Sequence, residues 1–245
     1  MTENPTKSTL WYAKAEINFN DFHWNSSILE NFYENIKDIF PKKEIRTNKN
    51  IEVNHKENGE VEIVDNGLEN VWICKTADEQ TVINLSKNRL ELVFLSYSSW
   101  EDTKKLVIEI AERYKNVTQM PIFMIALKYL HKINIGEKST YENLKKYFTF
   151  VPQIPLFEKG NNAESIQMRA EMLRKPDILM MTLATLLPEF EMLAPVVLEL
   201  FFSSLSTPAG WTLETWLEQA HDQIKEAFEM SITDWTKQNY EYDTF

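Results

Sequence analysis

Two acidic residues interrupt apolar segments at matching places in the two halves of the sequence. Glu91 lies in the segment 90–94, Leu-Glu-Leu-Val-Phe, and Glu199 lies in the segment 196–202, Val-Val-Leu-Glu-Leu-Phe-Phe. If the halves are repeats, the two glutamates could face each other across a twofold axis, and paired carboxylates share a proton or hold a metal ion. The favoured alternative is that both lie on the solvated face of a sheet, as strand alternation predicts.

The four histidines are far apart in the sequence, and their spacing indicates no metal site. His131 is a candidate for the border of a free sheet face, where it would form one polar site with Lys128, Glu91 and Glu199; a structural role is the alternative. His221 falls on the apolar side of the last predicted helix, so we expect a hydrogen-bonded core histidine there. We predict neither a metal nor a cofactor.

Familiar catalytic motifs are missing from the sequence. It contains no Gly-rich phosphate loop, no His-Glu-x-x-His, no Gly-x-Ser-x-Gly and no Cys-x-x-Cys. Its five glycines are too few and too far apart for a loop that wraps a phosphate group. Cys74 is the only cysteine, which excludes an intrachain disulfide and a cysteine-based zinc site within one chain. The sequence therefore favours a non-catalytic role over an enzyme.

Composition limits the partners and the location. The 245 residues include 37 acidic and 26 basic side chains, and the formal net charge is -11. Nucleic-acid binders usually show a basic footprint, so free nucleic acid is disfavoured as a partner. No stretch approaches the ~18 consecutive apolar residues of a membrane span, and residues 1–8 lack the apolar core of a signal peptide. We expect a cytoplasmic protein without membrane contact.

The two halves share one order of elements. Each contains an apolar strand, a turn, a tryptophan and a long amphipathic helix: 90–95, Trp100 and 101–114 in the first half, and 196–202, Trp211 and 212–233 in the second. Ser98 and Glu101 have the spacing of a capping box for the first of these helices. We expect each tryptophan to pack under its own helix as a hydrophobic staple; the alternative is that each anchors a contact with another protein.

Hydrophobic periodicity predicts the remaining elements. Residues 11–19 alternate as a half-buried strand whose apolar face is formed by Trp11, Ala13, Ala15, Ile17 and Phe19. We expect helices at 28–39 and 139–148, a hairpin within 44–70, and strands at 71–74, 81–85, 122–135, 166–173 and 178–187. The methionines of 166–187 leave a helix as the alternative for that stretch.

These elements predict an α+β fold of two similar halves, each a strand, a helix, a meander and a closing helix. The boundaries are a loose tail at 1–9, a first half at 10–118, and a second half at 119–245 with the C-terminal helix and an aromatic tail. The halves would join about a pseudo-twofold axis into one antiparallel sheet with the helices on one face. This topology is similar to that of the TATA-box-binding-protein class, an analogy that carries no function.

Aromatic residues near the C-terminus are candidates for a partner contact. They lie in an acidic segment that has little left to bury: Trp235, Tyr240, Tyr242 and Phe245. An exposed aromatic cluster gains most when a partner desolvates it, so we expect these residues to bind another protein. The alternative is that the segment docks on the body of its own chain.

Three segments resemble a known family. They are 97–101 (Tyr-Ser-Ser-Trp-Glu), 126–133 (Ala-Leu-Lys-Tyr-Leu-His-Lys-Ile), and the helix that carries His221, Ile224 and Phe228. They are similar to the Tyr-x-x-Trp-Glu turn, the Gly-Leu-Arg-Tyr-Ile-Asn-Arg-Ile strand and the closing helix of a sporadically distributed, uncharacterised family of bacterial and archaeal proteins of about this length. The strand departs from the family pattern at Ala126, Lys128 and His131, so a polar site built there in relatives is altered here. The resemblance implies no established activity; families distributed in this way often sit in mobile defence or toxin–antitoxin loci.

Three functions remain open. The favoured one is a non-catalytic protein-interaction or accessory subunit that binds another protein subunit or forms a homo-oligomer; the resemblance suggests a bacterial antiviral defence or toxin–antitoxin type module. The second is a ligand-sensing protein that uses the cleft between the halves. The third is an unrecognised metal-dependent, nuclease-like enzyme that uses Glu91, Glu199 and a histidine.

Overall fold

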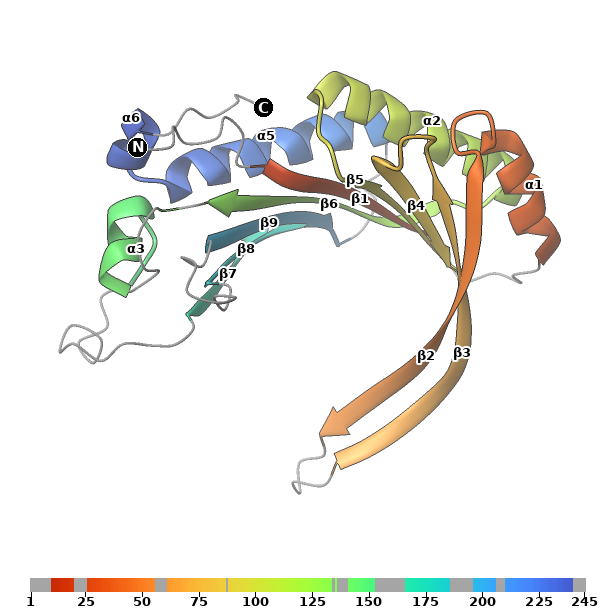
Figure 1. Ribbon diagram of the computed structural model, residues 1–245, viewed down its shortest axis with the longest axis horizontal. Helices are drawn as coiled ribbons and strands as arrows, with labels where there is room; N and C mark the ends of the chain where they lie inside the picture. The colour runs from red at the N-terminus through yellow and green to blue at the C-terminus, as the bar shows by residue number, and fades with distance from the viewer. Residues whose placement is uncertain are drawn as a thin grey trace.

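The computed structural model describes residues 10–19, 26–55, 61–86, 88–133, 135, 141–152, 166–185, 196–205 and 210–239. Nine strands form one sheet in the order β2-β3-β4-β5-β1-β6-β9-β8-β7, and every neighbouring pair is antiparallel (Figure 1). The strands are β1 (Leu10–Phe19), β2 (Lys42–His55), β3 (Val61–Lys75), β4 (Thr81–Ser86), β5 (Arg89–Phe94), β6 (Ile122–Ile133), β7 (Gln167–Arg174), β8 (Asp177–Thr185) and β9 (Val196–Ser204). The helices are α1 (Ser26–Ile36), α2 (Trp100–Thr118), α3 (Tyr141–Tyr147), α5 (Leu213–Ser231) and α6 (Asp234–Asn239). The predicted α+β class with a large antiparallel sheet is therefore confirmed.

β1 and β6 are the two central strands, and each is followed along the chain by the same order of elements: a helix, a meander and a long helix. β1 pairs with β5, the last strand of the meander β2-β3-β4-β5, and β6 pairs with β9, the last strand of β7-β8-β9. A shorter helix, α1 or α3, precedes each meander, and a long helix, α2 or α5, follows it. None of the described helices is long and apolar enough to cross a membrane.

Helices α1, α2 and α5 cover the outer, convex side of the arched sheet (Figure 1). The side chains of β1 alternate between the two sides of the sheet, and Ala13, Ala15 and Ile17 are fully buried on the side that the helices cover. Lys14 and Glu16, which lie between them, face the concave side and are part-exposed. This concave side, which no described helix covers, is called the free face below.

One hydrophobic core runs beneath both long helices. In the first half, the ring of Tyr114 in α2 lies 4.6 Å from that of Phe19 and 5.0 Å from that of Phe32 in α1. In the second half, Trp216 of α5 lies 5.8 Å from Phe202 of β9. All five side chains belong to one cluster of buried residues, so the two halves share their interior.

The hairpin of β2 and β3 is longer than the sequence indicated. A hairpin was expected within 44–70, with a separate strand at 71–74. In the structure β3 continues without interruption to Lys75 and pairs with β2 over almost its whole length. Figure 1 shows the far end of this hairpin projecting well beyond the rest of the sheet on the free-face side.

The start of β1 departs from the predicted alternation. The β1–β6 ladder has a register shift between Leu10 and Tyr12, and Trp11 is 49% exposed. An extra residue in one strand of an antiparallel pair breaks the alternation of side chains. Trp11 therefore does not join Ala13 on the buried face, and that part of the prediction was wrong.

The two long helices begin differently from the prediction. Ser99, not Ser98, caps α2; its hydroxyl accepts a hydrogen bond from the backbone N–H three residues later, at 3.1 Å. Thr212 caps α5. Trp100 is thus the first residue of its helix, whereas Trp211 precedes the cap of the other, and the two are not equivalent in position. Trp100 also packs against α5 rather than under its own helix.

Candidate functional site

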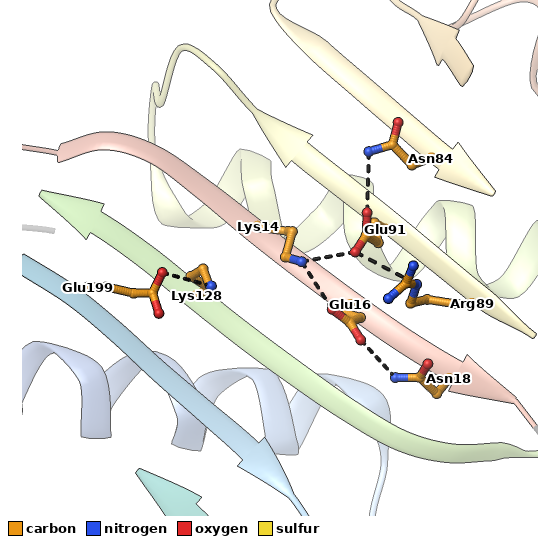
Figure 2. Close-up of polar contacts among 8 residues, drawn as sticks. All are labelled: Lys14, Glu16, Asn18, Asn84, Arg89, Glu91, Lys128 and Glu199. Carbon is orange, nitrogen blue, oxygen red and sulfur yellow. Dashed lines mark hydrogen bonds and ion pairs between the residues drawn. The ribbon is translucent and has the colours of Figure 1, made fainter. Parts of the chain in front are cut away.

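A network of ion pairs occupies the middle of the free face, on the strands β4, β5 and β1 (Figure 2). Lys14 of β1 donates hydrogen bonds to Glu91 of β5, at 2.9 Å, and to Glu16 of its own strand, at 3.0 Å. The three side chains are only 19%, 16% and 16% exposed, in the order Lys14, Glu16, Glu91. Their charges are therefore partly shielded from water and strongly coupled to one another.

Neighbouring polar side chains complete this network. Asn18 donates to Glu16 at 3.2 Å, Asn84 donates to Glu91 at 3.3 Å, and Arg89 Nε lies 3.8 Å from Glu91 (Figure 2). Burial alone would raise the pKa of Glu16, but the hydrogen bonds from Asn18 and Lys14 outweigh it, so the pKa is lowered. Glu16 is therefore ionised at neutral pH.

Lys14 keeps its proton for a corresponding reason. Burial lowers the pKa of its ammonium group, but the hydrogen bonds and charges of Glu91 and Glu16 raise it by more, so the net shift is upward. A lysine in this state is a fixed cation, which suits binding. It does not suit proton transfer near neutral pH, for which a lysine pKa must fall.

A second ion pair joins β6 and β9, which follow β1 in the sheet on the side away from β5. Lys128 of β6 donates to Glu199 of β9 at 2.8 Å (Figure 2), and its ammonium group lies 5.6 Å from the centroid of the Phe201 ring. Lys14 and Lys128 are directly opposite each other in the β1–β6 ladder. Like charges placed opposite each other repel. Here each lysine forms an ion pair with a glutamate on its outer neighbouring strand, Lys14 with Glu91 of β5 and Lys128 with Glu199 of β9.

The polar residues proposed from the sequence do not form a single site. Glu91 and Glu199 share the free face, but β1 and β6 lie between their strands, so the two strands alone are about 14 Å apart at the usual strand spacing. His131 lies on the helix side, fully buried, with its ring stacked on Phe228 at 4.2 Å. Of the four residues, the structure brings together only Lys128 and Glu199.

Sequence reasoning missed the part of the network that surrounds Lys14. The signal was present, because 11–19 alternates and its polar positions, Lys14, Glu16 and Asn18, had to lie on the face opposite the core. What the sequence lacked was the pairing of β1 with β5, which brings Glu91 within reach of Lys14.

Two exposed aromatic rings stand at opposite ends of the central strand pair. Trp11 lies at the register shift near the start of β1, and Phe123, 54% exposed, lies at a second shift near the start of β6. Ala15 and Leu127 are directly opposite each other in the β1–β6 ladder. Trp11 lies four residues before Ala15, and Phe123 lies four residues before Leu127. The ammonium group of Lys132, which alternation along β6 places on the free face, lies 5.2 Å from the Trp11 ring centroid.

The motif residues behind the family resemblance meet on the helix side of the sheet. Tyr129 shares a 2.8 Å hydrogen bond with Nδ1 of His221 and has its ring 5.9 Å from that of Tyr97. The imidazole of His221 is stacked on Trp100. Burial lowers the pKa of His221 to about 4, and its side chain is closed off from solvent, as expected for a core histidine. This cluster joins the sheet to α2 and α5.

The C-terminal candidates divide into one described residue and three that lie outside the described residues, Tyr240, Tyr242 and Phe245. Trp235 of α6 is 39% exposed and packs edge-on against Tyr147 of α3, with ring centroids 5.1 Å apart. The ammonium group of Lys146 lies 4.0 Å from the Trp235 ring. Trp235 is therefore held, at least in part, by its own chain.

One cavity of about 750 Å³ lies between the C-terminal half of α2 and the N-terminus of α5. Its lining includes Ile108, Lys115, Ile122, Trp211 and Leu213, a mixture of apolar and polar side chains. Among the described residues no three His, Cys, Asp or Glu side chains are close enough together to hold a metal ion.

No family model matches the chain, and no curated protein is similar to it at a significant level. The family suggested by the motifs therefore stays a proposal.

Proposed function

We propose that this chain is a non-catalytic protein-interaction subunit that binds a partner protein on the free face of its sheet. The observation that carries the proposal is the arrangement of that face. An ion-paired centre lies between two exposed aromatic rings at opposite ends of the central strands, Trp11 and Phe123. Ile122 and Ile125, which flank Phe123 in β6, both pack against the core, so the extra residue at this register shift turns away from the helix side. Aromatic anchors beside fixed polar groups are typical of surfaces at which proteins bind one another.

The centre of the face favours binding because its side chains are already ordered. Lys14, Glu16 and Glu91 hold one another through bonds of 2.9 and 3.0 Å and are less than one-fifth exposed. Association usually costs free energy because flexible side chains at the interface must be immobilised. Here much of that ordering precedes binding, so a partner contacts a surface that keeps its shape.

The distance between the aromatic rings suits a protein. About eight residues of the β1–β6 ladder separate the two register shifts, or about 25 Å along the strands. A surface of that length is contacted by a strand, a helix or a folded domain, whereas a small molecule is usually enclosed in a pocket. Trp11 supplies the stronger anchor, since tryptophan is enriched among the residues that dominate binding energy.

We also propose that the fold arose by internal duplication, with a topology like that of the TATA-box-binding-protein class. The supporting observations are the shared order of connection and the two symmetric register shifts. Leu95 and Leu205, the first residues after β5 and β9, are 52% and 51% exposed. The offset between Trp100 and Trp211 counts against an exact repeat. A face with two similar ends suits a partner that contacts both of them.

The motif resemblance supports placing this partner in a bacterial defence or toxin–antitoxin type module. In such modules the genes for interacting proteins are commonly adjacent, so the products of the neighbouring genes are the first candidates. We propose Tyr240, Tyr242 and Phe245 as a secondary contact with the same partner, because aromatic side chains contribute strongly to binding when another protein desolvates them.

Co-expression with the neighbouring gene products tests the proposal. The complex is isolated through a tag on this chain, and its mass is measured by light scattering. The affinity of the parent chain is then compared with that of Trp11→Ser, Phe123→Ser and the matched control Met230→Ser. Met230 is 53% exposed but lies on α5, on the opposite side of the sheet.

The free-face variants are expected to lose about tenfold or more in affinity, the usual effect of removing an aromatic anchor. Met230→Ser is expected to bind like the parent chain. All three residues are exposed, so circular dichroism should show no change of fold. Unchanged binding by both Trp11→Ser and Phe123→Ser would exclude the free face as the interface.

A ligand-sensing role is the second candidate, carried by the cavity between α2 and α5. Trp211 lines it and is part-exposed, so a bound molecule should change its fluorescence. A screen of metabolites by thermal shift would identify such a ligand. A ligand that stabilises the parent chain but not Ile108→Trp, which places a larger ring among the lining residues, would support this role; a ligand that stabilises both equally binds elsewhere.

A further inference from the structure

Strand β7 is one of the two edges of the sheet that the described residues form, and it lacks the prolines, lysines and register shifts that discourage an edge strand from pairing with another chain. Its ladder with β8 runs from Gln167 to Arg174 without a register shift, and the strand contains no proline. The opposite edge differs, because the β2 ladder has a register shift between Lys49 and Ile51 and the strand begins with two lysines. Such irregularities and lysines discourage edge-to-edge pairing.

The two faces of β7 differ in a way that is complementary to itself. On the helix side, Met168, Ala170 and Met172 are partly buried and pack against the core, but no described strand of this chain covers their outer flank. On the free face, Arg169 and Glu171 are 58% and 55% exposed and form an ion pair with each other at 2.6 Å.

We propose that two copies of the chain associate by antiparallel pairing of their β7 strands, centred on Ala170 of each copy. In this register Arg169 lies opposite Glu171 of the second copy, and Met168 lies opposite Met172 of the second copy. The twofold axis makes each pair occur twice. The contact completes the burial of the methionines and joins two nine-stranded sheets into one.

Other registers are less favourable. A shift of one residue would place side chains of the helix side opposite those of the free face and break the division between the two faces. A twofold axis through Glu171 would place that residue opposite its own copy, and an axis through Arg169 would do the same for the arginine. Like charges directly opposite destabilise a strand pair. In the central part of the strand, pairing about Ala170 is therefore the register that places side chains of the same face opposite each other and places each arginine opposite a glutamate.

Disulfide cross-linking tests the register directly. In Ala170→Cys the new thiols of two copies face each other at the Cα separation of directly paired residues, about 4.5–5.5 Å, which a disulfide spans. We expect a covalent dimer on mild oxidation, seen by non-reducing electrophoresis. The native Cys74 is 2% exposed and burial raises its pKa to about 11, so it should give no background.

Leu173→Cys is the matched control. Leu173 is 57% exposed, more than Ala170, so random collision would cross-link it at least as readily. In the proposed register the two copies of position 173 are about 20 Å apart, six residues along the strands. Dimer from Ala170→Cys and none from Leu173→Cys supports the proposal. No dimer from Ala170→Cys, or equal dimer from both, overturns it.

Charge reversal gives an independent test that needs no oxidation. Arg169→Glu places like charges opposite each other in a homodimer, and so does Glu171→Arg. Each variant alone should be monomeric by light scattering at concentrations where the parent chain dimerises. An equimolar mixture pairs acidic with basic copies and should regain the dimer mass. A mixture that stays monomeric, or single variants that dimerise like the parent chain, would contradict the pairing.

Discussion

Trp100, the first residue of α2, lies flat on the imidazole of His221 in α5, with ring centroids 4.2 Å apart and ring planes inclined by only 4°. The indole N–H of Trp100 donates to Glu218 at 2.8 Å, and Lys104 of α2 forms an ion pair with the same carboxylate. The two long helices come from different halves of the chain. These contacts therefore fix the halves to each other on the side opposite the free face.

Replacing Trp100 should consequently destabilise the whole fold. Trp100 is 7% exposed, so Trp100→Ala removes a large buried ring and leaves a cavity at the helix junction. We expect the free energy of unfolding to fall by about 3–5 kcal/mol. Urea denaturation measures the change. Trp211→Ala, at a part-exposed tryptophan, serves as the control and should cost clearly less; equal losses from both variants would show that the stack does not join the halves.

Stability should decrease below neutral pH because two histidines are buried in their neutral form. Burial lowers the pKa of His131 to about 3 and that of His221 to about 4, against about 6.5 in an unfolded chain. Between these values the unfolded chain binds protons that the folded chain does not. The free energy of unfolding therefore falls as the pH drops below about 6.5, by roughly 4 kcal/mol for both histidines together at pH 5.

Urea titrations at a series of pH values between 7.5 and 5 test this dependence. His131→Phe removes one titrating group and keeps an aromatic ring beside Phe228. The variant should show about half the slope of the parent chain, whatever its absolute stability. A parent chain equally stable at both ends of this range would mean that the histidines are not buried as described.

The outcome for the histidines shows what a single sequence can predict. His221 recurs with Leu217 and Ile224 on the apolar side of a helix, and that periodicity placed it correctly in the core. His131 was assigned to the wrong side because the segment 122–135 is apolar on both faces, so alternation gave no direction. Its face is set by α5, which the sequence could not place over β6.

The ion pair at the centre of the free face should contribute measurably to stability. Lys14→Met leaves Glu16 and Glu91 partly buried without their cation, and we expect a loss of about 1–2 kcal/mol in urea denaturation. Lys37→Met is the control, because Lys37 and its partner Glu34 are 54% and 59% exposed, and such pairs contribute little. Equal effects from the two variants would show that the network is no more than a surface contact.

Most of the free face could be inferred only in outline. Polar positions in 11–19 indicated a solvated face, and Glu91 and Glu199 were assigned to it correctly by alternation. Their partners depend on which strands are neighbours and in what register, and these are long-range facts of the sheet. The exposure of Trp11 depends on a register shift that leaves no mark in the local sequence.

Removing the C-terminal helix should separate two roles of this region. Truncation after Thr233 deletes α6, including Trp235 and the fully buried Thr236, whose hydroxyl donates to the carbonyl of Tyr147 at 2.8 Å. The melting temperature should fall clearly. Truncation after Asn239 removes only the aromatic tail and should leave the melting temperature unchanged while it weakens partner binding. The reverse pattern would show that the tail is part of the core.

Hydroxyl-radical footprinting of the chain, alone and in complex with a co-purified partner, tests the central proposal most directly. Trp11 and Met230 are almost equally exposed, at 49% and 53%, but Trp11 lies at the end of the central strands and Met230 lies on α5. Binding on the free face predicts that the partner protects Trp11 and Phe123 from oxidation and leaves Met230 as reactive as before. Protection of Met230, with Trp11 and Phe123 unchanged, would place the partner on the helices and contradict the account.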